Sequence, residues 1–310
     1  MKKILLIICP LLALGAILFY KFLEKDHYEA RFPIDFVPFT RQPRTEVKIG
    51  DLSYQFMIDL GSSSFITMKS TLLSTLEKKP HRSIVSFDMK GNKYYSESYI
   101  IPEIKIRNIT IRKIEVIEET ADFLQKASVI YDSTKTTLDD DIREKPGRIG
   151  RDLFVKFHSN IFMDFGSGMM YACCHLRDRK KDGYIPSKFI RVPFELDDRE
   201  GIVLTIGTDF GQRRFMLDTG ATKCVVQPFV VKERECSEWR PGVLQSHSEQ
   251  CVIGGKDFGG VDFLLYELAP IFERLDGVIG MDFMMKHVVY LDFGKKMAYI
   301  GKANECRKTE

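Results

Sequence analysis

The stretch RRFMLDTGATKCVV, Arg213–Val226, leads an apolar run into an aspartate, turns at a glycine and becomes apolar again. A carboxylate between two apolar runs is expected to be partly buried, and burying an unpaired charge costs several kcal/mol. A second carboxylate that shares its proton offsets this cost, because the pair then carries one charge instead of two. Asp218 therefore predicts a second strand and turn of the same kind elsewhere in the chain.

An internal duplication supplies that second aspartate. The stretch YQFMIDLGSSSFITM, Tyr54–Met68, aligns FMIDLGSSSFIT with FMLDTGATKCVV and places Asp59 opposite Asp218. Three further matches keep the same order in both copies: RFPIDF (31–36) with RVPFEL (191–196), GRIGRDLF (147–154) with GVIGMDFM (277–284), and NIFMDFGSGMMYA (160–172) with VVYLDFGKKMAYI (288–300). Repeats of this kind define architecture, so we expect the chain to fold as two similar halves.

The residue pattern within each half indicates β structure. Residues 103–119, EIKIRNITIRKIEVIEE, alternate apolar and polar side chains as a half-buried pair of strands does. Lys90-Gly91-Asn92 lies between β-prone flanks, which is the chemistry of a tight hairpin. We expect two mostly antiparallel β lobes, with these boundaries: first lobe 26–175, connector 176–190, second lobe 191–303 and tail 304–310.

Composition is typical of a globular protein. The 310 residues are 44% hydrophobic and 29% charged, and the net charge is +3. Residues 1–25 hold four lysines against one glutamate, which accounts for that whole charge. The rest of the chain is neutral, so the charge pattern predicts no nucleic-acid partner.

The N-terminus resembles a targeting segment. Two lysines precede an uncharged apolar run over residues 4–20, and KFLEKD follows it. A run of this length lies at the lower limit for a bilayer span. We expect residues 1–25 to form a signal anchor that holds an extracytoplasmic body at the membrane. The alternative is a signal peptide that is cleaved to release a secreted protein.

The cysteines permit disulfides without defining them. One of the seven, Cys9, lies in the apolar run, and the even number that remains is compatible with pairing in an exported chain. Cys173-Cys174-His175 suggests a metal site, but adjacent ligands chelate poorly and no second pair has ligand spacing. The sequence therefore predicts no metal.

The duplicated motifs resemble those of aspartic proteases of the pepsin and retroviral type. The resemblance spans roughly residues 31–302 and depends on Asp59-Leu60-Gly61-Ser62 and Asp218-Thr219-Gly220-Ala221, each followed by an apolar-Gly element at 148–150 or 278–280. It implies an all-β fold of two closed-barrel-like lobes, a monomeric catalytic unit and no cofactor. It also implies that Asp59 and Asp218 are catalytic, supported by Gly61, Ser62, Thr219, Gly220 and Ala221.

The implied reaction is hydrolysis of an extended peptide. Two carboxylates about 3 Å apart cannot both ionise readily, so the pair holds one proton. One carboxylate can then accept a proton from water while the other donates to the scissile carbonyl. A β hairpin would cover the substrate, and Gly91 with Tyr94 or Tyr95 is the candidate flap. An ordinary core hairpin would have the same sequence pattern.

The first motif departs from the family at Leu60, where threonine is expected. In relatives both threonines hydrogen-bond the opposite loop, so Leu60 should remove half of that brace. Ser62 can still bond Asp59, which favours Asp59 as the ionised partner. The alternative is a noncatalytic, membrane-anchored peptide-binding module with the same fold.

Two further aspartates, Asp164 and Asp292, occur in paired DFG segments. We expect them to begin the exposed turn of the last hairpin of each lobe, because FGS and FGK are turn sequences. The chain contains no G-x-S-x-G or H-E-x-x-H motif, which disfavours serine hydrolases and zinc peptidases.

Overall fold

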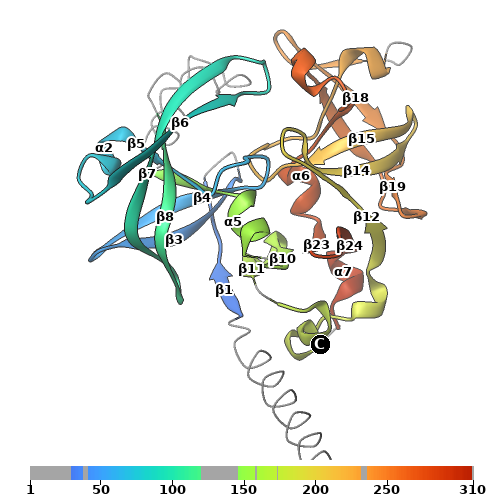
Figure 1. Cartoon of the computed structure of the whole chain (residues 1–310). Helices are drawn as coiled ribbons and strands as arrows, with labels where there is room; N and C mark the ends of the chain where they lie inside the picture. The colour runs from blue at the N-terminus through green and yellow to red at the C-terminus, as the bar shows by residue number, and fades with distance from the viewer. Residues whose placement is uncertain are drawn as a thin grey trace, which may run out of the picture.

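A computed structural model describes residues 29–37, 41–119, 146–157, 159–172, 174–231 and 236–308. The first half of the chain forms an eight-stranded sheet in the order β2-β3-β4-β9-β5-β8-β7-β6, and β3 also pairs with β7 (Figure 1). Its strands are β2 (Asp35–Phe36), β3 (Pro43–Ile49), β4 (Leu52–Asp59), β5 (Ile66–Lys69), β6 (Lys79–Phe87), β7 (Lys93–Ile106), β8 (Ile109–Glu119) and β9 (Gly147–Gly150). The extra pairing of β3 with β7 makes this sheet barrel-like.

The second half forms a ten-stranded sheet in which β13 pairs with β14 beside the path β17-β18-β21-β16-β22-β15-β14-β19-β20. Its strands are β13 (Glu195–Asp197), β14 (Gly201–Thr208), β15 (Gly211–Leu217), β16 (Val225–Val226), β17 (Ser237–Arg240), β18 (Val243–Ser248), β19 (Val252–Ile253), β20 (Lys256–Asp257), β21 (Val261–Leu265) and β22 (Gly277–Ile279). The predicted all-β class is confirmed.

A six-stranded sheet joins the two halves. Its order is β1-β11-β10-β23-β24-β12, so strands of the first copy lie on one side of the β10–β23 pair and strands of the second copy on the other. The strands are β1 (Ala30–Pro33), β10 (Ile161–Asp164), β11 (Met169–Ala172), β12 (Ile190–Pro193), β23 (His287–Asp292) and β24 (Met297–Lys302). In Figure 1 this sheet lies below the gap between the halves.

Helices in the described residues are short. The α-helices are α2 (Ser70–Leu73), α5 (Arg151–Lys156), α6 (Met281–Met284) and α7 (Ala303–Cys306). The 3-10 turns are η1 (Phe165–Ser167), η2 (Leu176–Asp182), η3 (Pro186–Lys188), η4 (Pro228–Val231) and η5 (Pro270–Phe272). Helices α5 and α6 occupy equivalent places, each directly after the apolar-Gly strand of its copy.

The two copies repeat the same strand pairings. β4 runs parallel to β9 as β15 runs parallel to β22, and β5 is antiparallel to β9 as β16 is to β22. The glycines that end β9 and follow β22 have no room for a side chain. A Cβ on Gly150 would lie 2.2 Å from the carbonyl oxygen of Ser64, and one on Gly280 would lie 2.5 Å from that of Lys223. Each apolar-Gly element therefore supports the loop that follows the aspartate.

The predicted membrane segment, residues 1–25, lies outside the described residues and stays a prediction. Among the residues that are described, none of the helices combines the length and apolar character needed to cross a bilayer. The expected hairpins are present: β7 and β8 pair over the alternating isoleucines, and β6 and β7 pair on either side of Lys90-Gly91-Asn92.

No disulfide joins two of the described cysteines, which are Cys174, Cys224, Cys236, Cys251 and Cys306. Cys224 is fully buried, and its Sγ lies 3.0 Å from Oδ1 of Asp282. Burial and the Asp282 carboxylate raise the pKa of the Cys224 thiol well above its usual value, so the group stays protonated. The thiol acts here as a hydrogen-bond donor within the core.

Asp164 and Asp292 begin turns as expected, but their side chains are buried rather than exposed. Asp164 Oδ1 accepts from the Ser167 amide at 3.1 Å, and Asp292 Oδ1 accepts from the Lys295 amide at 3.0 Å. The second oxygen of Asp164 is 2.7 Å from Arg307, and that of Asp292 is 2.8 Å from Lys295. These cationic partners offset the cost of burial.

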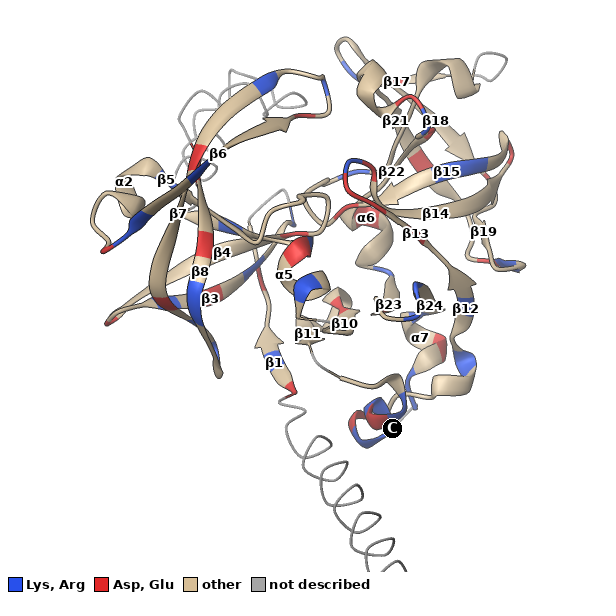
Figure 2. Ribbon diagram, in the orientation of Figure 1, with Lys and Arg blue, Asp and Glu red and all other residues tan. Residues whose placement is uncertain are grey.

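Basic and acidic residues lie on both halves (Figure 2). One basic side chain, Arg151 at the start of α5, is almost fully buried. Its guanidinium donates to the carbonyl oxygens of Gly61 at 3.2 Å, Asp197 at 3.0 Å and Asp198 at 2.5 Å. Arg151 therefore links the loop after β4 in the first half to the turn between β13 and β14 in the second half.

Replacing Arg151 with methionine, the residue at the equivalent position 281, should lower the free energy of unfolding by about 2–4 kcal/mol. Three partly buried hydrogen bonds to carbonyl oxygens would lose their charged donor, and each such loss costs about 1–3 kcal/mol before the site relaxes. Urea denaturation followed by circular dichroism measures the change. Arg177→Met is the matched control because the Arg177 side chain is 79% exposed. Equal midpoints for the two variants would contradict the prediction.

Candidate active site

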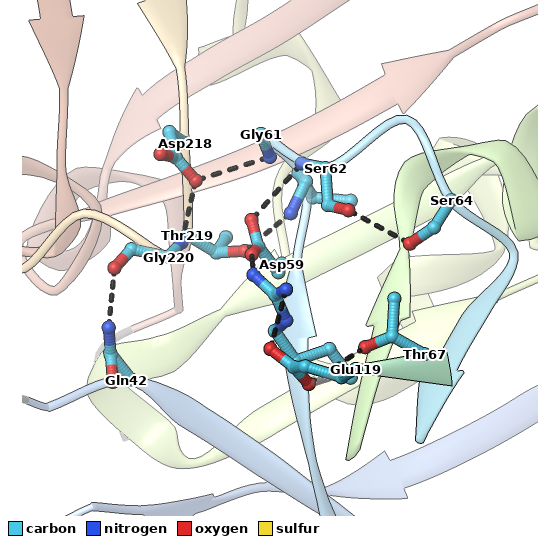
Figure 3. A network of polar contacts seen from close by, with 12 residues as sticks. Gln42, Asp59, Gly61, Ser62, Ser64, Thr67, Glu119, Asp218, Thr219 and Gly220 are labelled. Carbon is cyan, nitrogen blue, oxygen red and sulfur yellow. Dashed lines mark hydrogen bonds and ion pairs between the residues drawn. The ribbon is translucent and has the colours of Figure 1, made fainter. Parts of the chain in front are cut away.

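Asp59 and Asp218 meet where two loops cross. Asp59 is the last residue of β4, and Asp218 follows β15 directly. A Cβ on Gly61 would lie 2.5 Å from Cγ of Asp218, and one on Gly220 would lie 2.7 Å from Oδ1 of Asp59. Each glycine thus faces the aspartate of the other half (Figure 3). Only a residue without a side chain allows the two loops to approach so closely.

Backbone amides hold both carboxylates in place. Asp218 Oδ1 accepts from the amides of Gly220 at 2.7 Å and Gly61 at 3.1 Å, so each half of the chain supplies one donor. Asp59 Oδ1 accepts from the amide of Ser62 at 3.1 Å. The Ser62 hydroxyl is 2.8 Å from that of Ser64 instead. The expected bond between Ser62 and Asp59 is therefore made by the backbone.

Asp218 is the carboxyl group that retains a proton. Burial, followed by the charge of Asp59, raises the pKa of Asp218 to about 8. A side-chain hydrogen bond with Asp59 raises it further, while the Gly220 and Gly61 amides lower it. Since the two carboxyl groups interact this closely, they titrate as a pair that holds one proton over a broad pH range.

Half of the brace between the loops is present. Thr219, fully buried, donates from Oγ1 to the carbonyl oxygen of Ile58 at 2.7 Å and accepts from the amide of Leu60 at 2.9 Å. Leu60 is also fully buried and packs in the main hydrophobic core. The first loop consequently contributes apolar packing where the second contributes two hydrogen bonds.

The loop after Asp218 is fixed at two further points. The carbonyl oxygen of Gly220 accepts from Nε2 of Gln42 at 2.5 Å. That of Ala221 accepts from the amide of Met281 at 2.8 Å. Gln42 comes from the first half of the chain, and this contact was not predicted because its sequence neighbourhood carries no motif.

Arg148 is the principal residue that the sequence analysis missed. Its Nη1 lies 3.2 Å from Oδ2 of Asp59, and its Nη2 lies 2.8 Å from Oε1 of Glu119. The Arg148 side chain is 17% exposed, and those of Asp59 and Glu119 are 10% and 4% exposed. The three side chains form a nearly buried ionic cluster. Thr67 Oγ1 adds a hydrogen bond to Glu119 at 3.3 Å (Figure 3).

Arg148 carries a charge in this cluster. Burial by itself lowers its pKa, but the carboxylates of Glu119 and Asp59 raise it, and the net shift is upward. The repeat pattern predicts an apolar-Gly element at residues 148–150 like that at 278–280. That description is wrong at position 148, where the aligned residue of the other copy is Val278. A charged residue at an apolar position of a repeat is a signal that would have identified it.

The candidate flap is an ordered hairpin turn over residues 88–92. Asp88 Oδ1 accepts from the amides of Lys90 and Asn92, both at 2.9 Å. Its Oδ2 accepts from the hydroxyl of Tyr94 at 2.7 Å. The Asp88 carboxylate holds the turn together with backbone hydrogen bonds from Gly91 to Asp88 and from Asp88 to Asn92. Tyr94 is buried.

The tip of this hairpin contacts the second half. The amide of Ala269 donates to the carbonyl oxygen of Met89 at 2.9 Å, and a Cβ on Gly91 would lie 2.7 Å from Cβ of Ala269. Met89 packs against the apolar cluster that also contacts Ala221. Tyr95 is 69% exposed, and Lys93 lies over its ring. The hairpin thus spans from the first half to the second close to the loop of Asp218.

No protein-family model and no curated protein matches the chain. Among solved structures, the crystal structure of an aspartic proteinase from Irpex lacteus matches with a TM-score of 0.59 and 12% sequence identity. The match covers 89% of this chain and 98% of that one. The chain has the fold of an aspartic proteinase. In this aspartic proteinase fold, Asp59 and Asp218 lie at equivalent positions of the two copies.

Thr219→Val should lower the free energy of unfolding by about 2 kcal/mol, because the Ile58 carbonyl and the Leu60 amide would both lose their buried partner. The side chains have similar shapes, so packing changes little. Urea denaturation measures the difference, with Thr205→Val on the exposed face of β14 as control. Equal stability of both variants would contradict the role of Thr219 as a brace.

Asp218→Asn should stabilise the protein increasingly as the pH rises from about 4 to about 8. The folded state keeps the Asp218 proton up to a pKa of about 8, whereas the unfolded chain releases it near 3.8. In this interval the folded state binds the extra proton, so its stability falls with rising pH. Asparagine carries no titrating proton, so the variant does not lose this free energy of unfolding. The difference between the two proteins should grow by at most about 1.4 kcal/mol per pH unit.

Denaturation at several pH values measures this difference. Asp51→Asn, in the exposed turn between β3 and β4, is the control, and its effect should not vary over the same interval. A constant difference between Asp218→Asn and the natural protein would show that the raised pKa of Asp218 is wrong.

Proposed function

We propose that the protein is an aspartic endopeptidase that hydrolyses peptide bonds with a water molecule activated by Asp59 and Asp218. The observation that carries this proposal is the crossing of the two loops, in which Gly61 donates to Asp218 and Gly220 lies against Asp59. Two buried carboxyl groups that share one proton have the acid and the base that peptide hydrolysis needs.

The roles of the two groups follow from their surroundings. Asp59, beside the Arg148 guanidinium, is the anion that accepts a proton from the attacking water. Asp218, with a pKa of about 8, is the acid that donates its proton to the scissile carbonyl oxygen. The resulting tetrahedral diol collapses when the proton on Asp59 passes to the amide nitrogen, one diol hydroxyl returns its proton to Asp218, and the C–N bond breaks. No covalent intermediate with the protein is required.

The substrate we propose is an extended peptide. A strand-like peptide would lie beneath the 88–92 turn and pair with backbone groups once the hairpin lifts. The turn contacts Ala269, so the hairpin must lift for substrate to enter. We further propose that a single chain is the catalytic unit. Residues 4–20 would anchor it to the membrane with an extracytoplasmic body, or would be cleaved to release a secreted form.

Cleavage of a mixed peptide library by purified residues 26–310 tests the enzymatic proposal. Asp59→Asn and Asp218→Asn should each reduce cleavage at least about 1,000-fold, because each variant removes the shared proton or its acceptor. Asp51→Asn should cleave like the natural protein. Product analysis by mass spectrometry measures the rates between about pH 3 and pH 8. Cleavage that survives either substitution would rule out the shared-proton mechanism.

The second candidate function is noncatalytic peptide binding. Leu60 favours it because the loop of Asp59 has only half of the brace, and Arg148 favours it because it contacts an oxygen of Asp59 that water would otherwise reach. In that case the same peptide library would bind without cleavage at every pH, and the affinity would be unchanged in both Asn variants.

A further inference from the structure

The two copies differ in charge directly around the carboxyl pair. Aligning GRIGRDLF with GVIGMDFM places Arg148 opposite Val278 and Arg151 opposite Met281. Both arginines come from the first half and both contact the site, Arg148 at Asp59 and Arg151 at the carbonyl oxygen of Gly61. A symmetric backbone therefore surrounds two carboxyl groups whose electrostatic environments differ.

The contact of Arg148 with Asp59 favours one location for the shared proton. A positive charge within about 4 Å of a carboxylate favours its ionised form, and nearly buried side chains are poorly screened by solvent. The guanidinium is on Oδ2 of Asp59, at 3.2 Å. Arg148 also acts on Asp218, but less strongly than on Asp59. The amides of Gly220 and Gly61 favour the ionised form of Asp218, and burial together with the charge of Asp59 outweighs them.

Glu119 limits how strongly Arg148 acts. Its carboxylate is closer to the guanidinium than Asp59 is, at 2.8 Å against 3.2 Å. Glu119 is the last residue of β8, and Thr67 of β5 hydrogen-bonds its second oxygen. Two carboxylates thus compete for one cation, and the strength of the Arg148–Asp59 contact depends on the charge of Glu119.

We propose that Arg148 is a positioning residue that keeps Asp59 anionic and the shared proton on Asp218, and that Glu119 sets how strongly it does so. The inference rests on the proposed peptidase function for its kinetic consequence. With Asp59 held anionic, the pair takes up its second, inactivating proton at a lower pH. Arg148 therefore controls the acid limb of the pH profile of kcat/KM, which is the pH range where activity falls as the pair takes up its second proton.

Other charged groups near the pair belong to Arg151 and its surroundings. The Arg151 charge is offset by Asp152, whose Oδ1 lies 3.5 Å from it, and by the charges of Asp197 and Asp198. Arg151 itself also acts electrostatically on Asp59. Variants at positions 148 and 119 leave all of them unchanged.

The test compares the pH dependence of kcat/KM in four proteins. Arg148→Met with Glu119→Gln removes the cation and its second partner together, so Glu119 is not left as an unpaired buried charge and Asp59 alone loses its cationic neighbour. The acid limb should move up by about one pH unit or more, the lower part of the range for an arginine beside a carboxylate. Glu119→Gln alone frees Arg148 for Asp59 and should move the same limb down. Arg148→Lys keeps the charge and should keep the limb near its natural position.

The proposal is supported if the acid limb moves up in Arg148→Met/Glu119→Gln, moves down in Glu119→Gln and stays near its natural position in Arg148→Lys. A merely structural role of Arg148 predicts no such pattern. An unmoved limb in the Arg148→Met/Glu119→Gln protein would overturn it. Higher kcat/KM of that protein at every pH, with the acid limb unmoved, would also overturn it. Arg148 would then block access to Asp59 instead of keeping Asp59 ionised.

A second readout separates this inference from the proposed function. In protein labelled with carbon-13 at the aspartate carboxyls, the signals of the pair are those lost in Asp59→Asn and Asp218→Asn. If the natural protein cleaves no peptide, the peptidase proposal fails. The lower titration midpoint of the pair should still rise in the Arg148→Met/Glu119→Gln protein. A midpoint equal to that of the natural protein would overturn the role of Arg148 whether or not peptides are cleaved.

Discussion

Two carboxyl groups that share a proton in a buried site are the constraint on which the rest of this molecule depends. Asp59 and Asp218 come from loops whose glycines lie against the opposite aspartate. Removing water from two like charges is costly unless a proton and aligned donors compensate them. The amides of Gly61, Ser62 and Gly220 supply those donors. The six-stranded sheet, which pairs β10 with β23, keeps the two halves in the register that this arrangement requires.

Duplication produced a symmetric backbone, and individual side chains have removed the symmetry of the site. Thr219 makes two hydrogen bonds across the interface, whereas Leu60 packs in the core at the equivalent position. Arg148 and Arg151 stand where the second copy has Val278 and Met281. Thr219 thus gives hydrogen bonds to the loop of Asp218, while the two arginines place positive charge at Asp59 and its loop. The outcome is a pair of carboxyl groups in different electrostatic surroundings.

The two arginines near the carboxyl pair, Arg151 and Arg148, have different roles. Arg151 donates to three carbonyl oxygens and joins the halves, so its contribution is to stability and alignment. Arg148 contacts the carboxylates of Asp59 and Glu119, so its contribution is electrostatic. A planar guanidinium suits both uses because it presents several donors in fixed directions and keeps its charge when buried.

The sequence by itself determined the duplication, the all-β class, the two hairpins and the pair Asp59 and Asp218, because those features depend on local alternation, turn residues and glycines that recur in order. Only the tertiary structure decided that Arg148, Glu119 and Gln42 reach the site, and that the Ser62 hydroxyl turns to Ser64. The contacts of Arg148, Glu119 and Gln42 join segments far apart in the chain, and no periodicity within one strand encodes them. A side chain's partner across a sheet is set by register and packing, which exist only once the chain has folded.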